Sequence, residues 1–228
     1  MKRATFMIYI TGDTHGDIDF KKLLLLKEKN LSHKDYLIIC GDAGICWSPG
    51  LFQYYIDMYN DIGCTIIFVD GNHENFTMLN QCPLVEYLGA LMHQVDEHIF
   101  HVLRGEIMTI ENKTFLCIGG AVSIDKMYRT PYVSWWPEEE ITYHDIDNAL
   151  DNLNKVNFKV DYVITHCCDS FMVTNYLRFK KDICTDQLSF INKQVSYKHW
   201  FFGHYHYDRK ISDKETCLYQ DIVEMTSD

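Results

Sequence analysis

Five short segments of the sequence combine glycine with acidic, amide and imidazole side chains that could bind metal ions. They read GDTHG, GDAG, GNHE, TH and GHYH, at residues 12–16, 41–44, 71–74, 165–166 and 203–206. A single histidine or aspartate at a strand end is more often a turn or capping residue than a ligand. Together, however, the segments supply carboxylate, imidazole and carboxamide donors, which suit manganese, iron or zinc and exclude a thiolate-rich structural site. The set therefore favours a catalytic centre with two metal ions.

The segments share a position, because each comes after a short apolar run that reads as a buried strand. These runs lie at residues 6–10, 36–40, 65–70, 159–165 and 198–202. Helix-like stretches at 18–29 and 51–60 separate the first three runs, as in an α/β sheet. In such a sheet ligands bind at the edge where the carboxyl ends of the strands meet. We therefore expect all five segments to converge at that edge.

The middle of the chain has a different pattern. Closely spaced apolar runs at 98–102, 106–110 and 114–118, with turn signals between them, predict an antiparallel meander. Pro137 and the three glutamates that follow it predict a helix running to about Leu153, because proline suits the first turn and acids favour the positive end of the helix dipole.

Composition limits the classes of protein to which the chain can belong. Its 47% hydrophobic residues are typical of a globular protein, and 228 residues without a linker or repeat predict one domain, residues 1–228. The apolar runs are far shorter than the roughly 20 residues that span a bilayer, and no signal-peptide pattern appears. We expect a cytoplasmic protein, with no membrane partner and with its nine cysteines reduced. The net charge of -11 argues against a broad nucleic-acid-binding surface.

In this order, the five segments resemble those of the calcineurin-like metallophosphoesterase family, from Ile10 to about Tyr207. The resemblance implies an α/β (α+β) fold, a four-layer sandwich in which two mixed β-sheets pack together between flanking helices. The metal site would lie at the carboxyl ends of the strands. The strands and helices expected above are compatible with this architecture, which the apolar periodicity does not itself specify.

The resemblance also implies seven metal ligands in two sites. One metal ion would be held by Asp13, His15 and His206. The other would be held by Asn72, His166 and His204, and Asp42 would bridge the two. The expected cofactors are two divalent or transition metal ions, manganese first, with iron, zinc, nickel and cobalt as alternatives. A hydroxide that bridges the ions would be the nucleophile.

Three further residues near these ligands have expected roles of other kinds. His73 resembles a family histidine that does not bind metal but donates a proton to the leaving oxygen or stabilises the transition state. Asp17 and Glu74 could each orient an active-site histidine, or merely start the following helix.

The second segment departs from the Ser/Thr protein phosphatases of the family, in which it carries an arginine that binds phosphate. Residues 41–47 of this chain contain no arginine, which weakens the case for a protein substrate. We expect Lys126 and Arg129 to replace it, since a guanidinium can bind phosphate through two bonds; a solvated basic loop is the alternative. Trp135 and Trp136 are expected to pack in the core rather than to form an aromatic wall over the site.

The predicted activity is metal-dependent hydrolysis of a phosphomonoester, with nucleotide, small-molecule and phosphoprotein substrates all open. A phosphodiesterase or a dinucleoside-polyphosphate pyrophosphohydrolase is the alternative, because the same dimetal chemistry serves both. A non-catalytic interaction module that keeps the fold is a third hypothesis, and the intact ligand set argues against it. The only partner that the sequence implies is a phosphorylated substrate, and it specifies no oligomeric state.

Overall fold

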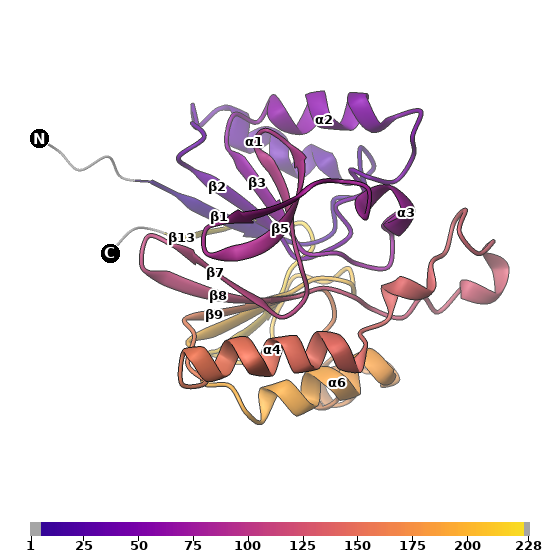
Figure 1. The fold of residues 1–228 in the computed structure, drawn as a ribbon, viewed down its shortest axis with the longest axis vertical. Helices are drawn as coiled ribbons and strands as arrows, with labels where there is room; N and C mark the ends of the chain where they lie inside the picture. Colours follow the sequence, from indigo (N-terminus) through magenta and orange to yellow (C-terminus); the bar gives the residue numbers. More distant parts are fainter. Residues whose placement is uncertain (1–5, 226–228) are drawn as a thin grey trace, which may run out of the picture.

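The computed structural model describes residues 6–225, which form two β-sheets packed face to face (Figure 1). Sheet A has the strand order β13-β1-β2-β3-β6-β5-β4. Its strands are β1 (Ile8–Thr11), β2 (Tyr36–Ile39), β3 (Thr65–Phe68), β4 (Leu84–Tyr87), β5 (Ala90–Asp96), β6 (Ile99–Val102) and β13 (Val223–Met225). Sheet B has the order β11-β12-β10-β9-β8-β7. Its strands are β7 (Glu106–Ile110), β8 (Lys113–Ile118), β9 (Tyr162–Thr165), β10 (His199–Phe202), β11 (Arg209–Lys210) and β12 (Glu215–Cys217).

Helices cover the outer face of each sheet and complete four layers (Figure 1). The helices over sheet A are α1 (Leu24–Lys27), α2 (Phe52–Asn60) and α3 (Phe76–Leu79). Those on the side of sheet B are α4 (Tyr143–Lys155), α5 (Ser170–Met172) and α6 (Ile183–Asn192), with a π-helical turn at Val173–Leu177. Short 3-10 turns lie at Phe20–Leu23, Lys126–Tyr128 and Pro137–Glu139. The expected four-layer α/β sandwich is therefore confirmed.

The central strands of both sheets are buried on two faces, which explains their continuous apolar runs. In β2, Ile38 packs between the sheets, while Leu37 and Ile39 pack against the helices. Successive side chains of a strand point to opposite faces, so a strand covered on both sides needs apolar residues at every position. The same arrangement holds in β9, where Ile164 faces sheet A and Val163 faces the helices over sheet B.

Parallel pairing brings together the carboxyl ends of the strands that precede the five predicted metal-binding segments. In sheet A, β1, β2 and β3 run parallel, and in sheet B, β8, β9 and β10 do so. Each of the five segments predicted to bind metal lies at the end of one of these strands or begins after at most two intervening residues. The two sheets therefore present all of these segments at one end of the sandwich.

The predicted meander is wrong for its first strand. β6 belongs to sheet A, where it pairs in parallel with β3. Of the three predicted strands, only β7 and β8 pair with each other, antiparallel in sheet B. The chain passes from one sheet to the other at residues 103–105, where Gly105 has a φ of 84°. The spacing of apolar runs predicts strands, but it does not specify which strand edge each run will meet.

The helix predicted from Pro137 is also corrected. Pro137–Glu139 forms only a 3-10 turn, and α4 begins at Tyr143. Thr142 sets this start through a capping box: its hydroxyl accepts from the Asp145 N–H, and the Asp145 carboxylate accepts from the Thr142 N–H at 2.7 Å. The capping box therefore places the helix boundary after the glutamates, one of which, Glu139, is buried.

Two further sequence features can be compared with the structure. All nine cysteines are free, and every one except Cys82 is buried. Among residues 6–225, no helix is both long and apolar enough to cross a membrane.

Candidate metal centre

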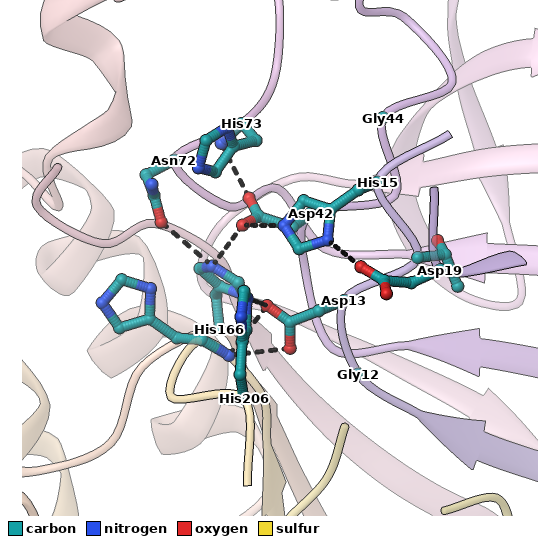
Figure 2. Close-up of polar contacts among 12 residues, drawn as sticks. Gly12, Asp13, His15, Asp19, Asp42, Gly44, Asn72, His73, His166 and His206 are labelled. Atoms are coloured by element: carbon teal, nitrogen blue, oxygen red, sulfur yellow. Dashed lines mark hydrogen bonds and ion pairs between the residues drawn. The ribbon is translucent and has the colours of Figure 1, made fainter. Parts of the chain in front are cut away.

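Side chains from the ends of five strands point toward one another at one end of the sandwich (Figure 2). Ligand atoms of Asp13, His15 and His206 lie within 4.8 Å of one another, and so do those of Asp13, Asp42 and His166. All seven predicted metal ligands lie in this cluster or line the cavity that opens onto it. The structure therefore brings together residues separated by up to 193 positions, from Asp13 to His206.

Asp42 lies at the centre of the cluster and is buried. Its Oδ2 atom is 3.2 Å from His15 Nε2 and 3.3 Å from His166 Nε2. Its Oδ1 atom accepts a hydrogen bond from the backbone N–H of His73 at 2.7 Å. One carboxylate thus faces imidazoles from both sheets, which is the position that a bridging ligand needs.

The remaining ligands group around the imidazoles on either side of Asp42. On one side, His206 Nε2 lies 3.6 Å from Asp13 Oδ1. On the other, the carboxamide Oδ1 of Asn72 lies 3.2 Å from His166 Nε2, and the rings of His166 and His204 are 4.9 Å apart. The contacts place Asp13 beside His206, and His166 beside Asn72 and His204; the assignment of these residues to two separate ions stays a prediction.

Hydrogen bonds fix the orientation of two of the imidazoles. His166 Nδ1 donates to the Cys40 carbonyl at 2.8 Å, and His15 Nδ1 lies 2.7 Å from a carboxylate oxygen of Asp19. With Nδ1 engaged in this way, Nε2 of each ring is directed into the cluster, where it can bind a metal ion in place of a proton.

The Asn72 carboxamide is oriented by a separate chain of hydrogen bonds. Its Nδ2 donates to Ser123 Oγ at 3.3 Å, and Ser123 in turn donates its N–H and its hydroxyl to the Glu139 carboxylate, both at 2.7 Å. Because the amide nitrogen is held by Ser123, the amide oxygen faces His166.

The electrostatics of the cluster are those of an anionic site. Burial lowers the pKa of His15 and His166, but the charge and hydrogen bonds of Asp42 outweigh it and raise these pKa values to about 9 and about 10. Burial and the neighbouring His166 instead lower the pKa of His204 to about 3. Carboxylates that draw protons onto adjacent imidazoles would bind a divalent cation in place of those protons.

The backbone at the ligands is held in an uncommon conformation. Asp13, His15, Asp42, His204 and His206 all have positive φ angles, between 34° and 70°. Such a conformation costs of order 1–3 kcal/mol for a residue other than glycine, and it persists where surrounding structure enforces it. Five of the seven predicted ligands thus have a strained backbone, which is typical of a functional site.

The glycines of the segments permit this crowding. A Cβ atom on Gly41, whose φ is 87°, would overlap the imidazole of His166, and a Cβ on Gly203 would overlap the Asp13 carboxylate. The closely packed carboxylate, imidazole and carboxamide donors fit a dinuclear metal centre. One ion would be held by Asp13, His15 and His206, the other by Asn72, His166 and His204, and Asp42 would contribute to both sites.

His73 and Arg129 meet beside the cluster. Arg129 Nη2 lies 3.1 Å from His73 Nε2, and its Nε pairs with Asp125 at 2.8 Å. Burial lowers the pKa of His73, and the nearby Arg129 charge lowers it further, while Asp42 opposes the change. Both side chains line a cavity of about 550 Å³ that also includes Asp42.

Lys126 is not brought to this cavity. Its Nζ pairs with Glu140 at 2.9 Å and lies over the ring of Trp135, 5.7 Å from the centroid. Trp136 is buried and packs against Trp47, while Trp135 is partly exposed; neither tryptophan lines the cavity. A substrate-binding role for Lys126 therefore stays a prediction without geometric support.

Two residues that the sequence analysis did not single out, Asp19 and Tyr219, support the ligands. Asp19 binds His15, and Tyr219 donates to Asp19 at 2.9 Å while its ring stacks on His206, with centroids 4.5 Å apart. The spacing of four residues between His15 and Asp19 was a signal that could have been used. No local pattern pointed to Tyr219.

Asp17 and Glu74 do not orient a histidine. Asp17 accepts a long hydrogen bond from Tyr55 at 3.5 Å. Glu74 is buried, and its carboxyl accepts from the N–H groups of Ala43 and Gly44 at 2.8 and 3.3 Å. Burial and the Asp42 charge raise the pKa of Glu74 to about 8. Glu74 therefore supports the loop that follows Asp42.

Comparison with known proteins gives the same fold. The crystal structure of TT1561 from Thermus thermophilus matches with a TM-score of 0.55 and 8% identity, over 98% of this chain and 99% of that one. The phosphopantetheinyl hydrolase PptH from Mycobacterium tuberculosis matches with a TM-score of 0.55 and 15% identity, over 95% and 89%. No curated protein matches significantly. The family model of calcineurin-like phosphoesterases matches residues 6–208, and the chain therefore belongs to this family of metal-dependent phosphoester hydrolases.

Proposed function

We propose that this protein is a phosphomonoesterase that uses two metal ions, with manganese as the preferred metal. The observation that carries the proposal is the cavity of about 550 Å³ in which the predicted ligands Asp42, Asn72, His204 and His206 share a wall with His73 and Arg129. A dimetal floor beside a guanidinium suits a phosphoryl group, since both are complementary to its oxygens. The nine free cysteines support a reducing, cytoplasmic compartment.

The proposed mechanism divides the work among the residues around the cavity. When bound, the two metal ions would polarise the phosphoryl group and activate a water for in-line attack. Arg129 would contact the phosphoryl oxygens with those N–H groups of its Nη atoms that do not face His73, because its Nε is engaged by Asp125. His73, fixed through its backbone bond to Asp42 and its contact with Arg129, would stabilise the transition state beside the leaving oxygen.

The direct test compares two variants on a phosphomonoester with added manganese. Asp42→Asn should lose most turnover because it weakens both metal sites, and His73→Ala should lower kcat by about 100-fold or more while retaining bound metal. Metal content, measured by elemental analysis, separates the two effects. If both variants kept full metal-dependent turnover, the proposed mechanism would be wrong.

A parallel assay of phenyl phosphate and bis(phenyl) phosphate distinguishes the proposal from a phosphodiesterase. We expect the monoester to be cleaved faster, since Arg129 and two cations together match the two negative charges of a monoester better than the single charge of a diester. Faster hydrolysis of the diester would contradict the proposal and indicate a phosphodiesterase.

A further inference from the structure

The cavity continues beyond the metal cluster into a part with a different chemistry. Val122 and Ile124 line it from the segment after β8, and Phe179 and Tyr205 line it from segments associated with sheet B. Ile124 is 97% exposed and Phe179 is 43% exposed. Large apolar side chains left in water at the rim of a cavity are typical of ligand-binding grooves.

Phe179 is placed at this rim by an unusual stretch of backbone. It follows the π-helical turn Val173–Leu177 and Arg178, whose φ is 68°, and its N–H donates to the Val173 carbonyl at 3.1 Å. Its ring lies 5.4 Å from that of Tyr205, which follows the ligand His204. π-helical turns occur frequently at functional sites, where they redirect the chain. This turn directs an aromatic ring to the cavity instead of to the core.

The charges of this outer part balance one another. Apart from the predicted metal ligands and His73, the charged residues that line the cavity are Arg129 and Lys180, against Asp125 and Asp182. Two positive and two negative charges sum to zero, and Arg129 is already paired with Asp125. Once one phosphoryl group has occupied the metals and Arg129, no cationic cluster remains in the cavity for a second phosphate.

We propose that Phe179 and Ile124 bind the leaving group of the substrate and that this group is an uncharged, apolar alcohol, aromatic or with a long alkyl chain. This inference rests on the proposed phosphomonoesterase function and specifies its substrate class. The inference is supported by one cavity that contains both the predicted metal ligands with Arg129, which would bind the phosphoryl group, and the apolar residues Ile124 and Phe179 at its outer part, where the charges balance. Substrates whose leaving group carries phosphate, such as nucleoside diphosphates, are disfavoured. The negative charge of that leaving group would face Asp125 and Asp182, and the positive charges of Arg129 and Lys180 do not exceed those of the two aspartates.

The test compares hydrolysis of hexyl phosphate and ethyl phosphate by the manganese-loaded enzyme. The two alcohols are chemically similar leaving groups, so a preference reports on the additional methylenes. We expect kcat/KM to be at least about tenfold higher for hexyl phosphate, because each buried methylene contributes to binding. Phe179→Ala should reduce this preference to about threefold or less, and Ile124→Ala should reduce it by a smaller factor.

Phe171→Ala provides the matched control, since Phe171 is an exposed phenylalanine, at 60%, that does not line the cavity. It should keep the wild-type preference. The ratio of the two substrates is unaffected by the amount of folded enzyme, so partial misfolding of a variant cannot imitate the result.

Three outcomes would overturn the inference. A wild-type ratio near one, an unchanged ratio in Phe179→Ala, or faster hydrolysis of ADP than of hexyl phosphate would each contradict an apolar leaving-group site. If ethyl phosphate is hydrolysed in a metal-dependent way but chain length has no effect, only this inference fails. If neither alkyl phosphate nor phenyl phosphate is hydrolysed with any added metal, the proposed function fails with it.

Discussion

At the scale of single residues, the imidazoles predicted to bind metal are held by partners that are not themselves predicted ligands. Asp19 receives His15 on one oxygen and the Tyr219 hydroxyl on the other, while the Tyr219 ring stacks on His206. One tyrosine therefore supports His15 and His206, two of the three residues expected to hold one ion together with the bridging Asp42. Such outer partners fix the tautomer and the ring orientation of a ligand.

Removing Asp19 should weaken metal binding at this site. We expect Asp19→Ala to lower the affinity for that ion by about 10–100-fold, because His15 Nδ1 loses its partner. Tyr219→Phe, which keeps the ring but loses the hydroxyl, should have a smaller effect of the same sign. The measurement is competition against a chelating dye. Asp17→Ala serves as the control, since Asp17 contacts Tyr55, and equal losses in both aspartate variants would contradict the assignment.

The two basic residues predicted to bind phosphate are expected to behave differently. Arg129→Ala should lower kcat/KM on phenyl phosphate by at least about tenfold, because Arg129 contacts His73 within the cavity. Lys126→Ala should change it less than twofold, since its ammonium group pairs with Glu140 away from the cavity. Steady-state kinetics of both variants measures these effects. A larger loss of kcat/KM in Lys126→Ala than in Arg129→Ala would indicate that Lys126 is the phosphate-binding residue.

At the scale of elements, Arg104 joins the segment after β8 to the end of β3. Its Nε donates to Asp70 at 3.0 Å, and its Nη groups donate to the carbonyls of Glu138 and Glu140 at 2.7 and 2.8 Å. Asp70 also lies 3.1 Å from His101. Arg104, whose side chain is 8% exposed, thus anchors the segment that carries Arg129 beside the strand end that carries Asn72.

Replacing Arg104 should destabilise the fold strongly. Arg104→Met leaves the buried Asp70 without its main counter-charge, and removal of one partner of a buried ion pair costs about 3–5 kcal/mol. Urea unfolding at pH 7 measures this loss. A decrease in the free energy of unfolding of less than about 1 kcal/mol would show that the Arg104–Asp70 ion pair contributes little to stability.

The difference between wild type and Arg104→Met should depend on pH with a definite sign. Arg104 and His101 outweigh the effect of burial and hold the pKa of Asp70 below its usual range. A depressed folded-state pKa contributes stability that is present above the unfolded pKa, about 3.9, and is lost as pH falls toward the folded value. The wild type should therefore lose more of its advantage at pH 3.5 than at pH 5, and unfolding curves at both values test this.

At the scale of the whole molecule, the metal centre joins the two sheets. Asp13, Asp42 and Asn72 follow strands of sheet A, whereas His166, His204 and His206 follow strands of sheet B. Ions bound between these sets would link the two halves of the sandwich. Bound metal should therefore stabilise the complete fold and not only the loops that hold it.

Removing the metal should lower the melting temperature. Manganese at 100 times its Kd adds about 2.7 kcal/mol to the stability, which for a chain of this size corresponds to about 5–10 °C. Calorimetry with manganese and with EDTA measures the shift, and Asp42→Asn, which loses the shared ligand, should show much less of it. An equal shift in the variant would indicate that the stabilising ion binds elsewhere.

The sequence by itself determined the chemistry of the site and the positions of its main strands. Donor types are intrinsic to side chains, and buried strands need continuous apolar runs, so the segments that contain Asp42 and His166 could be predicted to meet at one sheet edge; their roles as ligands came from the family resemblance. Local patterns could not specify that β6 and β7 join different sheets, because that depends on which strand edge each meets.

Only the tertiary structure decided which neighbours of the site act on it. Asp17 and Asp19 are equally acidic, but the turn through His15 brings only Asp19 to the imidazole. Arg129 rather than Lys126 reaches the cavity, and Tyr219 arrives from 204 residues after His15. These choices depend on contacts between distant parts of the chain, whose geometry is settled only when the two sheets pack together.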